Sequence, residues 1–272
     1  MNSNNEQLTV ISYQLLNQYN EIAHFCTCRQ GGVSVGNYAS FNLSPFSGDD
    51  ATSFAHNKQK LCHHLGVDAD KLIIPYQTHG TVIQEIDETF INLKSDEQSK
   101  YLNGVDALFT QLSGICIGVT TADCVPILFF DPIKKVIAVA HAGWRGTCAR
   151  IAEMTVQTLV EKYQSKPEDI LVVIGPSISP DVYEVGKEVV ENFEMAGFDI
   201  SEIVTDRNNV SYLDLWKANQ QSLERVGVLK NHIEISGICT FSQHEQFFSA
   251  RRLGIKSGRM LSGIIMKNGL IC

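Results

Sequence analysis

Three side chains that can bind a metal each lie beside an apolar run of the sequence: His79, Cys124 and His141. We predict these runs to be buried strands, over residues 72–74, 115–120, 125–130 and 136–140. In layered α/β folds, ligands gather where strands end. Two imidazoles and one thiolate suit zinc, and three protein ligands leave a fourth position open, as in catalytic sites. The residues alone leave a second interpretation open, in which Cys124 is a buried thiol and both histidines are hydrogen-bonded core groups.

A turn with two glycines follows His141, and a helix is predicted directly after it. Free backbone N–H groups at the start of a helix bind anions. Arg145, which lies in this turn, adds a planar donor for phosphate or carboxylate. We therefore expect an anion within reach of a metal on His141. The alternative is a tight turn with Arg145 in a surface ion pair.

Apolar side chains at three- and four-residue spacing predict helices in three parts of the chain. These helices are expected over residues 53–65, 148–163 and 213–226, and Thr147 is the predicted N-cap of the second. The remaining predicted elements are a strand-like run over 8–16, a strand over 171–174, and alternating short strands and turns over 237–266. Residues 90–102 are polar and charged, and we expect a mobile or solvated connection there.

Strands and helices that alternate without a regular rhythm predict a layered α/β (α+β) fold. No linker divides the chain, so we predict a single layered domain over residues 1–272. A mixed β-sheet flanked by helices forms this domain, with residues 1–20 as a peripheral N-terminal strand.

The composition excludes several classes of function. The chain has 272 residues, of which 44% are hydrophobic, and its 30 acidic and 22 basic residues give a net charge of −8. An acidic protein lacks the basic face that duplex nucleic acid requires, and no apolar run approaches the roughly 20 residues of a membrane span. The first seven residues are polar, so we expect no export signal and a cytoplasmic protein. The eight scattered cysteines fit free thiols in that compartment.

Nine short blocks of the sequence resemble, in order, those of one known family. They are Gly31-Gly32-Val33-Ser34, Asn42-Leu43, Gln77-Thr78-His79-Gly80, Asp106-Ala107-Leu108, Thr121-Ala122-Asp123-Cys124-Val125-Pro126, His141-Ala142-Gly143-Trp144-Arg145-Gly146, Gly175-Pro176-Ser177-Ile178, Tyr183-Glu184-Val185-Gly186 and Phe248-Ser249-Ala250-Arg251-Arg252. On these blocks the chain resembles the laccase-like polyphenol oxidase family, whose members are also described as peptidoglycan editing factors and purine nucleoside phosphorylases. Human laccase domain-containing protein 1 is a relative. The resemblance extends over residues 25–266.

The resemblance implies a fold related to bacterial toxin deamidases and a zinc ion held by His79, Cys124 and His141. It implies that the partners are purine nucleosides and phosphate. Adenosine, inosine and methylthioadenosine would be cleaved to the free base and a ribose 1-phosphate, with adenosine deamination as a second activity. The chain departs from the family pattern at Lys58, where an arginine is expected, and at Leu253, where an acidic residue is expected. These departures concern substrate or loop contacts and leave the three zinc ligands unchanged.

The number of histidines argues against the copper chemistry in one of the family's names. A multicopper oxidase needs about ten histidine ligands, largely in H-x-H pairs, because several coppers share imidazoles. This chain has 8 histidines and no H-x-H pair. Polyphenol oxidase activity would therefore require a single copper at the same two histidines and cysteine, in place of zinc.

Cys124, His141 and Asp123 are the candidate catalytic residues of the nucleoside interpretation. Asp123 and Asp106 are candidates for proton transfer, because a carboxylate near zinc can act as a general base. Asp123 is explained equally well as a structural turn former.

The candidate substrate-binding residues are Asn42, Gln77 and Arg145. The two amides would contact the purine or the ribose, and Arg145 would contact phosphate. A cap within the glycine-rich loop is the alternative for Asn42. Whether the protein is a monomer or a homodimer is left open.

Two further hypotheses compete with the metalloenzyme. In the first, Cys124 is a nucleophile and His141 its base, which would make an amidase that edits peptidoglycan precursors. In the second, the protein is a ligand-binding or scaffold protein without catalytic activity. The scaffold hypothesis does not explain why three site residues at strand ends stand beside a predicted helix start.

Overall fold

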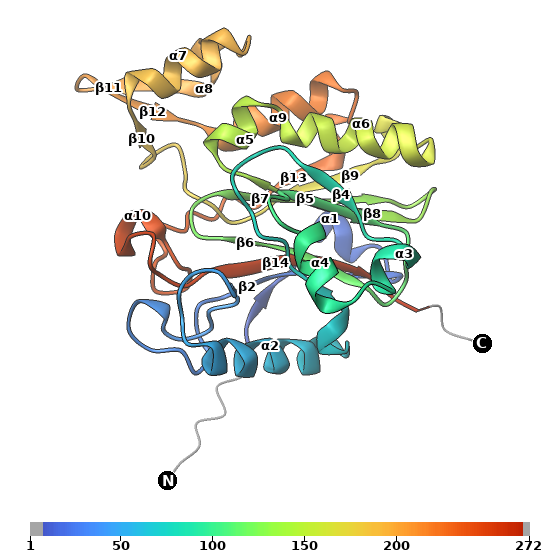
Figure 1. The fold of residues 1–272 in the computed structure, drawn as a ribbon. Coiled ribbons are helices and arrows are strands. Elements are labelled where there is room, and N and C mark those ends of the chain that lie inside the picture. Colours follow the sequence, from blue (N-terminus) through green and yellow to red (C-terminus); the bar gives the residue numbers. More distant parts are fainter. Residues whose placement is uncertain (1–7, 269–272) are drawn as a thin grey trace.

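Two β-sheets lie face to face between layers of helices (Figure 1). The computed structural model describes residues 8–268. The six-stranded sheet has the order β13-β9-β7-β8-β5-β4, with β4 (Ile83–Glu85), β5 (Ala107–Thr110), β7 (Val125–Asp131), β8 (Val136–Ala142), β9 (Leu171–Ile174) and β13 (Ile233–Ile235). The five-stranded sheet has the order β1-β2-β14-β6-β3, with β1 (Val10–Ile11), β2 (Ile22–Thr27), β3 (Leu72–Ile73), β6 (Cys116–Thr121) and β14 (Met260–Met266).

Helices cover the outer face of each sheet (Figure 1). On the six-stranded sheet these are α5 (Trp144–Cys148), α6 (Ile151–Tyr163) and α9 (Leu215–Arg225), and on the five-stranded sheet α2 (Ala51–Leu65). A small third sheet at one end of the molecule joins β10 (Glu184–Val185), β11 (Val204–Arg207) and β12 (Val210–Leu213). The shorter helices are α1 (Gln14–Asn17), α3 (Glu88–Ile91), α4 (Ser95–Tyr101), α7 (Lys187–Met195), α8 (Ile200–Ile203) and α10 (Ala250–Leu253). None of the helices in residues 8–268 is long and apolar enough to cross a bilayer.

The four inner strands of the six-stranded sheet, β5, β7, β8 and β9, are buried on both faces, which explains their long apolar runs. In β7, Leu128 and Phe130 pack between the two sheets. Ile127 and Phe129 of the same strand pack on the other side, in the core beneath the helices. Successive side chains of a strand alternate between faces, so an unbroken apolar run fills two cores at once. Parallel and antiparallel pairs coexist in both sheets, and the predicted mixed architecture is confirmed.

The predicted helix over 148–163 is broken. Arg150 has a left-handed backbone conformation with φ of 62° and separates α5 from α6. The apolar stripe of α6 is as predicted and includes Val156 and Leu159. Thr147 is not an N-cap, because it lies buried inside α5 and its hydroxyl donates to the Ala142 carbonyl.

Residues 90–102 are not a mobile connection, and this prediction is wrong. The segment contains the second half of α3 and all of α4. The Asp87 side chain caps α3 by accepting a hydrogen bond from the Phe90 N–H. Phe90 is buried against Tyr101, at 5.2 Å between ring centroids. The charged residues of this segment are the solvent face of two packed helices.

The predicted N-terminal strand is also shorter than expected. Within the described part of 1–20, β1 forms the edge of the five-stranded sheet, as predicted for a peripheral strand. Helix α1 follows it, and Tyr13 and Leu16 are buried in the main core. The rest of the prediction, residues 1–7, lies outside the described residues.

The loop between β2 and α2 is fastened by two asparagines. The Asn57 amide on α2 donates to Ser34 Oγ and to the Asn42 carbonyl, and Asn57 Oδ1 accepts from the Val33 N–H. The second asparagine, Asn42, is fully buried within the same loop. Glycine at position 32 permits the backbone to pass this close.

We predict that Gly32→Ala lowers the free energy of unfolding by about 3 kcal/mol, because buried overpacking cannot be relieved here. The added Cβ would lie 2.2 Å from the Ser40 carbonyl oxygen and 2.5 Å from Phe41 Cα, which are backbone atoms. Guanidinium denaturation measures this loss. The matched control is Gly36→Asn, at a φ of +61° with no atom within 4 Å of the added Cβ. Because asparagine tolerates this conformation, the control should lose less than about 1 kcal/mol; equal losses would contradict the close-packing account.

Candidate metal centre

The structure brings the three predicted metal ligands together. The ligand atoms of His79, Cys124 and His141 all lie within 4.8 Å of one another. The two imidazole rings are 4.8 Å apart between centroids and inclined by 75°. Within residues 8–268, no other cluster of three or more His, Cys, Asp or Glu side chains is arranged so that it could hold a metal ion.

Strand register explains why residues far apart in the chain meet here. Ala107 of β5 pairs with Ala140 of β8, so the preceding Asp106 lies beside His141. The His141 N–H donates to the Asp106 carbonyl at 2.8 Å. On the other side of β8, Val125 of β7 pairs with Ala142, which places Cys124 at the same end of the sheet.

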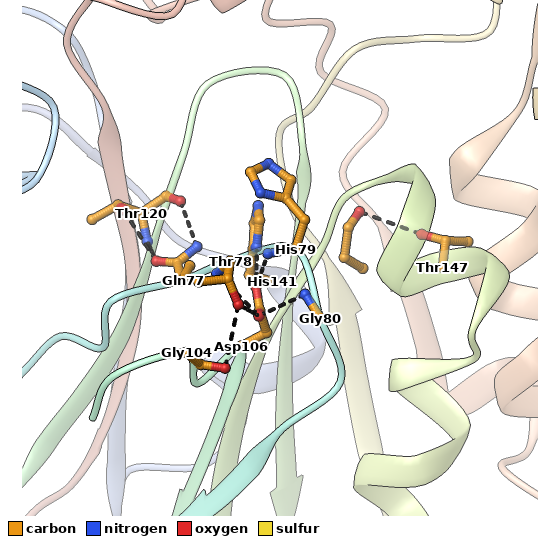
Figure 2. A network of polar contacts seen from close by, with 10 residues as sticks. Gln77, Thr78, His79, Gly80, Gly104, Asp106, Thr120, His141 and Thr147 are labelled. Carbon is orange, nitrogen blue, oxygen red and sulfur yellow. Dashed lines mark hydrogen bonds and ion pairs between the residues drawn. The ribbon is translucent and has the colours of Figure 1, made fainter. Parts of the chain in front are cut away.

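The carboxylate of Asp106 holds the two histidines in place (Figure 2). It is fully buried and accepts backbone N–H groups from Thr78, His79 and Gly80 at 3.2, 3.0 and 2.8 Å. It also lies 2.8 Å from Nδ1 of His141. This contact orients the His141 ring so that Nε2 is left for a metal, as the outer carboxylates of zinc sites do. Asp106 is therefore a positioning residue, and the predicted role in proton transfer does not fit its fully engaged oxygens.

The backbone next to the ligands fits a metal site. A Cβ at Gly143 would lie 3.0 Å from His79 Cδ2 and 3.1 Å from Cys124 Sγ, so no larger residue can stand there without displacing a ligand. His79 itself has a φ of 63°, an uncommon conformation that Asp106 stabilises through the backbone. Two nitrogens and one sulfur are a donor set that zinc accepts. The residues present therefore fit a metal held by three protein ligands.

The electrostatics of the site favour the metal-binding form of the thiol. Burial opposes ionisation of Cys124, but the charge of His141 and hydrogen bonds from both imidazoles outweigh it and lower the pKa of Cys124 from 9.0 to about 6. Burial also opposes the charged form of His141, yet Cys124 and Asp106 raise the pKa of His141 from 6.5 to about 9. Near neutral pH the metal-free site therefore holds a thiolate beside an imidazolium. The thiolate is the form that binds metals.

A cavity of about 560 Å³ opens beside the ligands and is lined by all three of them. Three exposed apolar side chains from different loops surround it: Phe46, Tyr76 and Ile255. The rings of Phe46 and Tyr76 meet edge to face at 4.9 Å. Enzyme pockets for small ligands span about 300–1,000 Å³ and are mostly apolar, so the cavity has the size and lining of a substrate site.

The two amide side chains that were predicted to bind substrate, Gln77 and Asn42, make hydrogen bonds within the protein instead. Gln77 lines the cavity, but its side chain donates to the Thr120 carbonyl and accepts from the Thr120 N–H (Figure 2). Asn42 does not line the cavity and is fully buried. Its oxygen accepts from the Arg259 N–H, and its nitrogen donates to Ser47 Oγ. Asn42 is thus the loop cap of the alternative interpretation, and its buried amide cannot touch a substrate in this conformation.

Asp123 and Arg145 also lie elsewhere than predicted. The Asp123 carboxylate accepts from Thr240 Oγ1, Ser249 Oγ and the Arg251 N–H, and it does not line the cavity. These contacts match the structural role that the sequence left open, and proton transfer by Asp123 stays a prediction. Arg145 is exposed, stacks on Trp144 at 4.3 Å and does not line the cavity either. The predicted anion site at this turn therefore has no support from the position of Arg145.

The polar residues of the cavity that the sequence analysis did not single out include Thr121, Lys256 and Arg259. One signal could have found Arg259, since it directly precedes an apolar run, the 260–266 strand. Thr121 likewise ends β6. The strand-end argument that identified the metal ligands applies equally to both.

Comparisons with known proteins agree with this architecture. Residues 23–267 match the family model described as multi-copper polyphenol oxidoreductase laccase. A purine nucleoside phosphorylase from Bacteroides thetaiotaomicron is 43% identical over 259 residues, covering 94% of this chain and 96% of the relative. An adenosine deaminase, RL5, from an unknown prokaryotic organism is 46% identical over 233 residues, covering 85% of this chain and 88% of the relative. The crystal structure of the Bacillus licheniformis hypothetical protein YfiH superposes with a TM-score of 0.88 at 28% identity, covering 96% of this chain and 98% of that one.

We predict that Asp106→Asn weakens zinc binding by about 10- to 100-fold, the usual effect of losing an outer carboxylate. An amide cannot accept all the N–H groups that Asp106 accepts. Competition with a chelator of known zinc affinity measures the change. The matched control is Asp131→Asn, a fully buried carboxylate whose Oδ1 accepts the Ile133 and Lys134 N–H groups at the far end of β7. The control should bind zinc as the unchanged protein does; an Asp106→Asn protein that does the same would contradict the positioning role.

We also predict that iodoacetamide alkylates Cys124 of the metal-free protein with a half-maximal rate near pH 6. The reactive thiolate is lost only as the pH falls through the lowered pKa. An unperturbed thiol would show its midpoint near pH 8.5, roughly. His141→Ala should move the midpoint upward, and bound zinc should block labelling. Peptide mass mapping assigns the label, and a midpoint above pH 8 in the unchanged protein would refute the thiolate–imidazolium pair.

Proposed function

The chain belongs to the family described as multi-copper polyphenol oxidoreductase laccase, and we propose that it is a zinc-dependent purine nucleoside phosphorylase. The proposed substrates are adenosine, inosine and methylthioadenosine, with inorganic phosphate, and adenosine deamination is a proposed second activity. The observation that carries the proposal is the meeting of His79, Cys124 and His141 in the wall of a cavity of about 560 Å³. A relative named purine nucleoside phosphorylase, at 43% identity, supports the proposed phosphorolysis. A relative named adenosine deaminase, at 46% identity, supports the proposed deamination.

Phosphorolysis exchanges one bond for another at the ribose. A phosphate oxygen bonds to C1′ as the C1′–N9 bond breaks, and the electron pair of that bond stays on the purine, which takes up a proton. The products are the free base and ribose 1-phosphate. In deamination, water adds at C6 of adenine and the amino group leaves as ammonia.

Each residue of the site has a defined part in this proposal. Zinc, when bound, would supply a Lewis acid that polarises a substrate group or lowers the pKa of a water. His79, Cys124 and His141 would hold it, and Asp106 keeps the His141 ring in the required orientation. The exposed rings of Phe46 and Tyr76 each offer an aromatic face for a purine, since bases stack well on aromatic side chains.

The donor set favours zinc over an electron-transfer copper. Copper sites with two histidines and one cysteine carry a weak axial ligand, usually methionine. No methionine is among the described residues that line the cavity. Gln77, another residue type that can serve as axial ligand, is occupied by Thr120. Polyphenol oxidation with copper at the same site is therefore the weaker proposal.

One observation favours a second candidate function. The site has the spatial order of a cysteine-hydrolase triad, in which a carboxylate contacts an imidazole and the imidazole contacts a thiol. Here the carboxylate of Asp106 lies 2.8 Å from the imidazole of His141, which in turn contacts the thiol of Cys124. In an amidase that edits peptidoglycan precursors, Cys124 would attack the amide carbon and His141 would move the proton. This candidate assigns no role to His79, which also contacts the thiol. A metal site uses all three residues.

The proposed function is tested by chromatography of products from zinc-loaded protein and adenosine, with and without phosphate. We expect adenine and ribose 1-phosphate only when phosphate is present, and inosine by the slower deamination. Cys124→Ser should lower the rate by at least about 100-fold, because the metal loses its thiolate.

The matched control is Cys148→Ser, a partly buried thiol on α5 whose Sγ contacts the Asn192 carbonyl away from the cavity. It should retain the rate of the unchanged protein. If neither adenosine nor inosine is turned over, the nucleoside proposal fails. Amide hydrolysis by the metal-free protein would then identify the thiol amidase.

A further inference from the structure

The cavity beside the metal ligands has an unusual charge for this protein. The chain carries 30 acidic against 22 basic residues. Among the described residues that line the cavity, there is no aspartate or glutamate, whereas Lys256 and Arg259 both line it. An acidic protein that keeps carboxylates out of one cavity and places two cations there has a cavity suited to an anion.

Arg259 is held by neutral acceptors and makes no ion pair with a carboxylate. Its Nη1 donates to the Ser257 carbonyl and hydroxyl and to the Gly258 carbonyl, and its Nη2 donates to the Ile255 carbonyl. These acceptors are neutral. In the described part of the chain, no carboxylate lies within 4.0 Å of this guanidinium, and Nε makes no hydrogen bond.

A partly buried cation without a paired anion is costly. Burial lowers the pKa of Arg259, against the opposing charges of Cys124 and Asp123. Asp123 makes no ion pair with this guanidinium, and its oxygens accept from three other donors. The guanidinium therefore keeps donors free for a planar or tetrahedral anion.

Strand register places an unpartnered hydroxyl next to this arginine. Met260 of β14 pairs with Thr121 of β6, so Arg259 lies beside the end of β6. Thr121 is 1% exposed and lines the cavity. Its Oγ1 has no hydrogen-bond partner among the described residues. Buried hydroxyls are nearly always hydrogen-bonded, so this one has hydrogen-bonding capacity that no described protein group uses.

We propose that Arg259, Lys256 and Thr121 form a phosphate-binding subsite of the cavity. The subsite rests on the proposed phosphorylase function, because it gives the reacting phosphate a place in the same cavity as the metal ligands. It replaces the turn at Arg145, which sequence reasoning favoured. The guanidinium of Arg259 supplies the directed donors, the ammonium of Lys256 a charge at the mouth, and the hydroxyl of Thr121 one hydrogen bond. The ligand is either inorganic phosphate or the phosphate group of ribose 1-phosphate.

The test titrates zinc-loaded protein with inorganic phosphate and, separately, with ribose 1-phosphate by calorimetry. Arg259→Gln should weaken phosphate binding by about 30-fold, Thr121→Val by about 5-fold and Lys256→Ala by about 3-fold. In turnover, the KM for phosphate should rise by the same factors while the KM for the nucleoside changes less than about 2-fold. The matched control is Lys230→Ala, an exposed lysine outside the cavity, which should bind phosphate as the unchanged protein does.

Two of these variants keep the test decisive if Arg259→Gln fails to fold. Lys256 is exposed, and Thr121 Oγ1 makes no hydrogen bond that valine would remove, so both variants should unfold at the unchanged temperature. Unchanged phosphate affinity in Lys256→Ala and Thr121→Val would overturn the subsite.

The outcomes separate the subsite from the enzymatic proposal. If the unchanged protein binds either phosphate ligand, loses it in the variants and turns over no nucleoside, the subsite stands and the phosphorylase fails. If it cleaves nucleosides with phosphate while all three variants keep the KM for phosphate, the phosphorylase stands and the subsite is overturned. Binding of ribose 1-phosphate alone assigns the subsite to the sugar phosphate, and binding of inorganic phosphate assigns it to the attacking group.

Discussion

The carboxylate of Asp106 makes five hydrogen bonds beside the candidate metal ligands: three to the backbone N–H groups of residues 78–80, one to the Thr78 hydroxyl and one to His141. Burying a charged carboxylate costs roughly several kcal/mol unless both of its oxygens accept hydrogen bonds. The donors here come from the loop that carries His79 and from the ring of His141. One buried charge thus fixes both imidazoles beside Cys124, whose position follows from the register of β7 and β8.

The two sheets contribute different halves of the site. In one sheet, Asp106 and Cys124 directly precede β5 and β7, and His141 lies at the end of β8. The antiparallel pairing of β8 with both strands brings the three residues to the same edge of the sheet. Strands β6 and β14 of the other sheet meet at Thr121 and Arg259. The cavity lies where these strand ends come together. The loop after β3 contributes His79 to its wall.

The three candidate metal ligands could be singled out from the sequence because each one stands close to the end of an apolar run. Arg259 and Thr121 could not be paired in that way, since their proximity depends on a long-range antiparallel register that no local pattern encodes. The helix break at Arg150 was missed because the apolar stripe of α6 continues in phase across it. Residues 90–102 were misjudged because one buried ring, Phe90, outweighs their charged composition.

The sequence left the roles of Asn42 and Asp123 open. The hydrogen bonds of both side chains in the structure are those of residues that hold loops in place. Kinship with toxin deamidases stays a prediction.

The central claim is that His79, Cys124 and His141 hold one zinc ion with a fourth position open. X-ray absorption at the zinc edge of the loaded protein tests it most directly, because nitrogen and sulfur neighbours differ in distance. The account predicts two nitrogens at about 2.0–2.1 Å, one sulfur at about 2.3 Å and one further light atom that adding substrate or phosphate perturbs. A first shell without sulfur, or one filled by four protein ligands and unchanged by substrate, would contradict it.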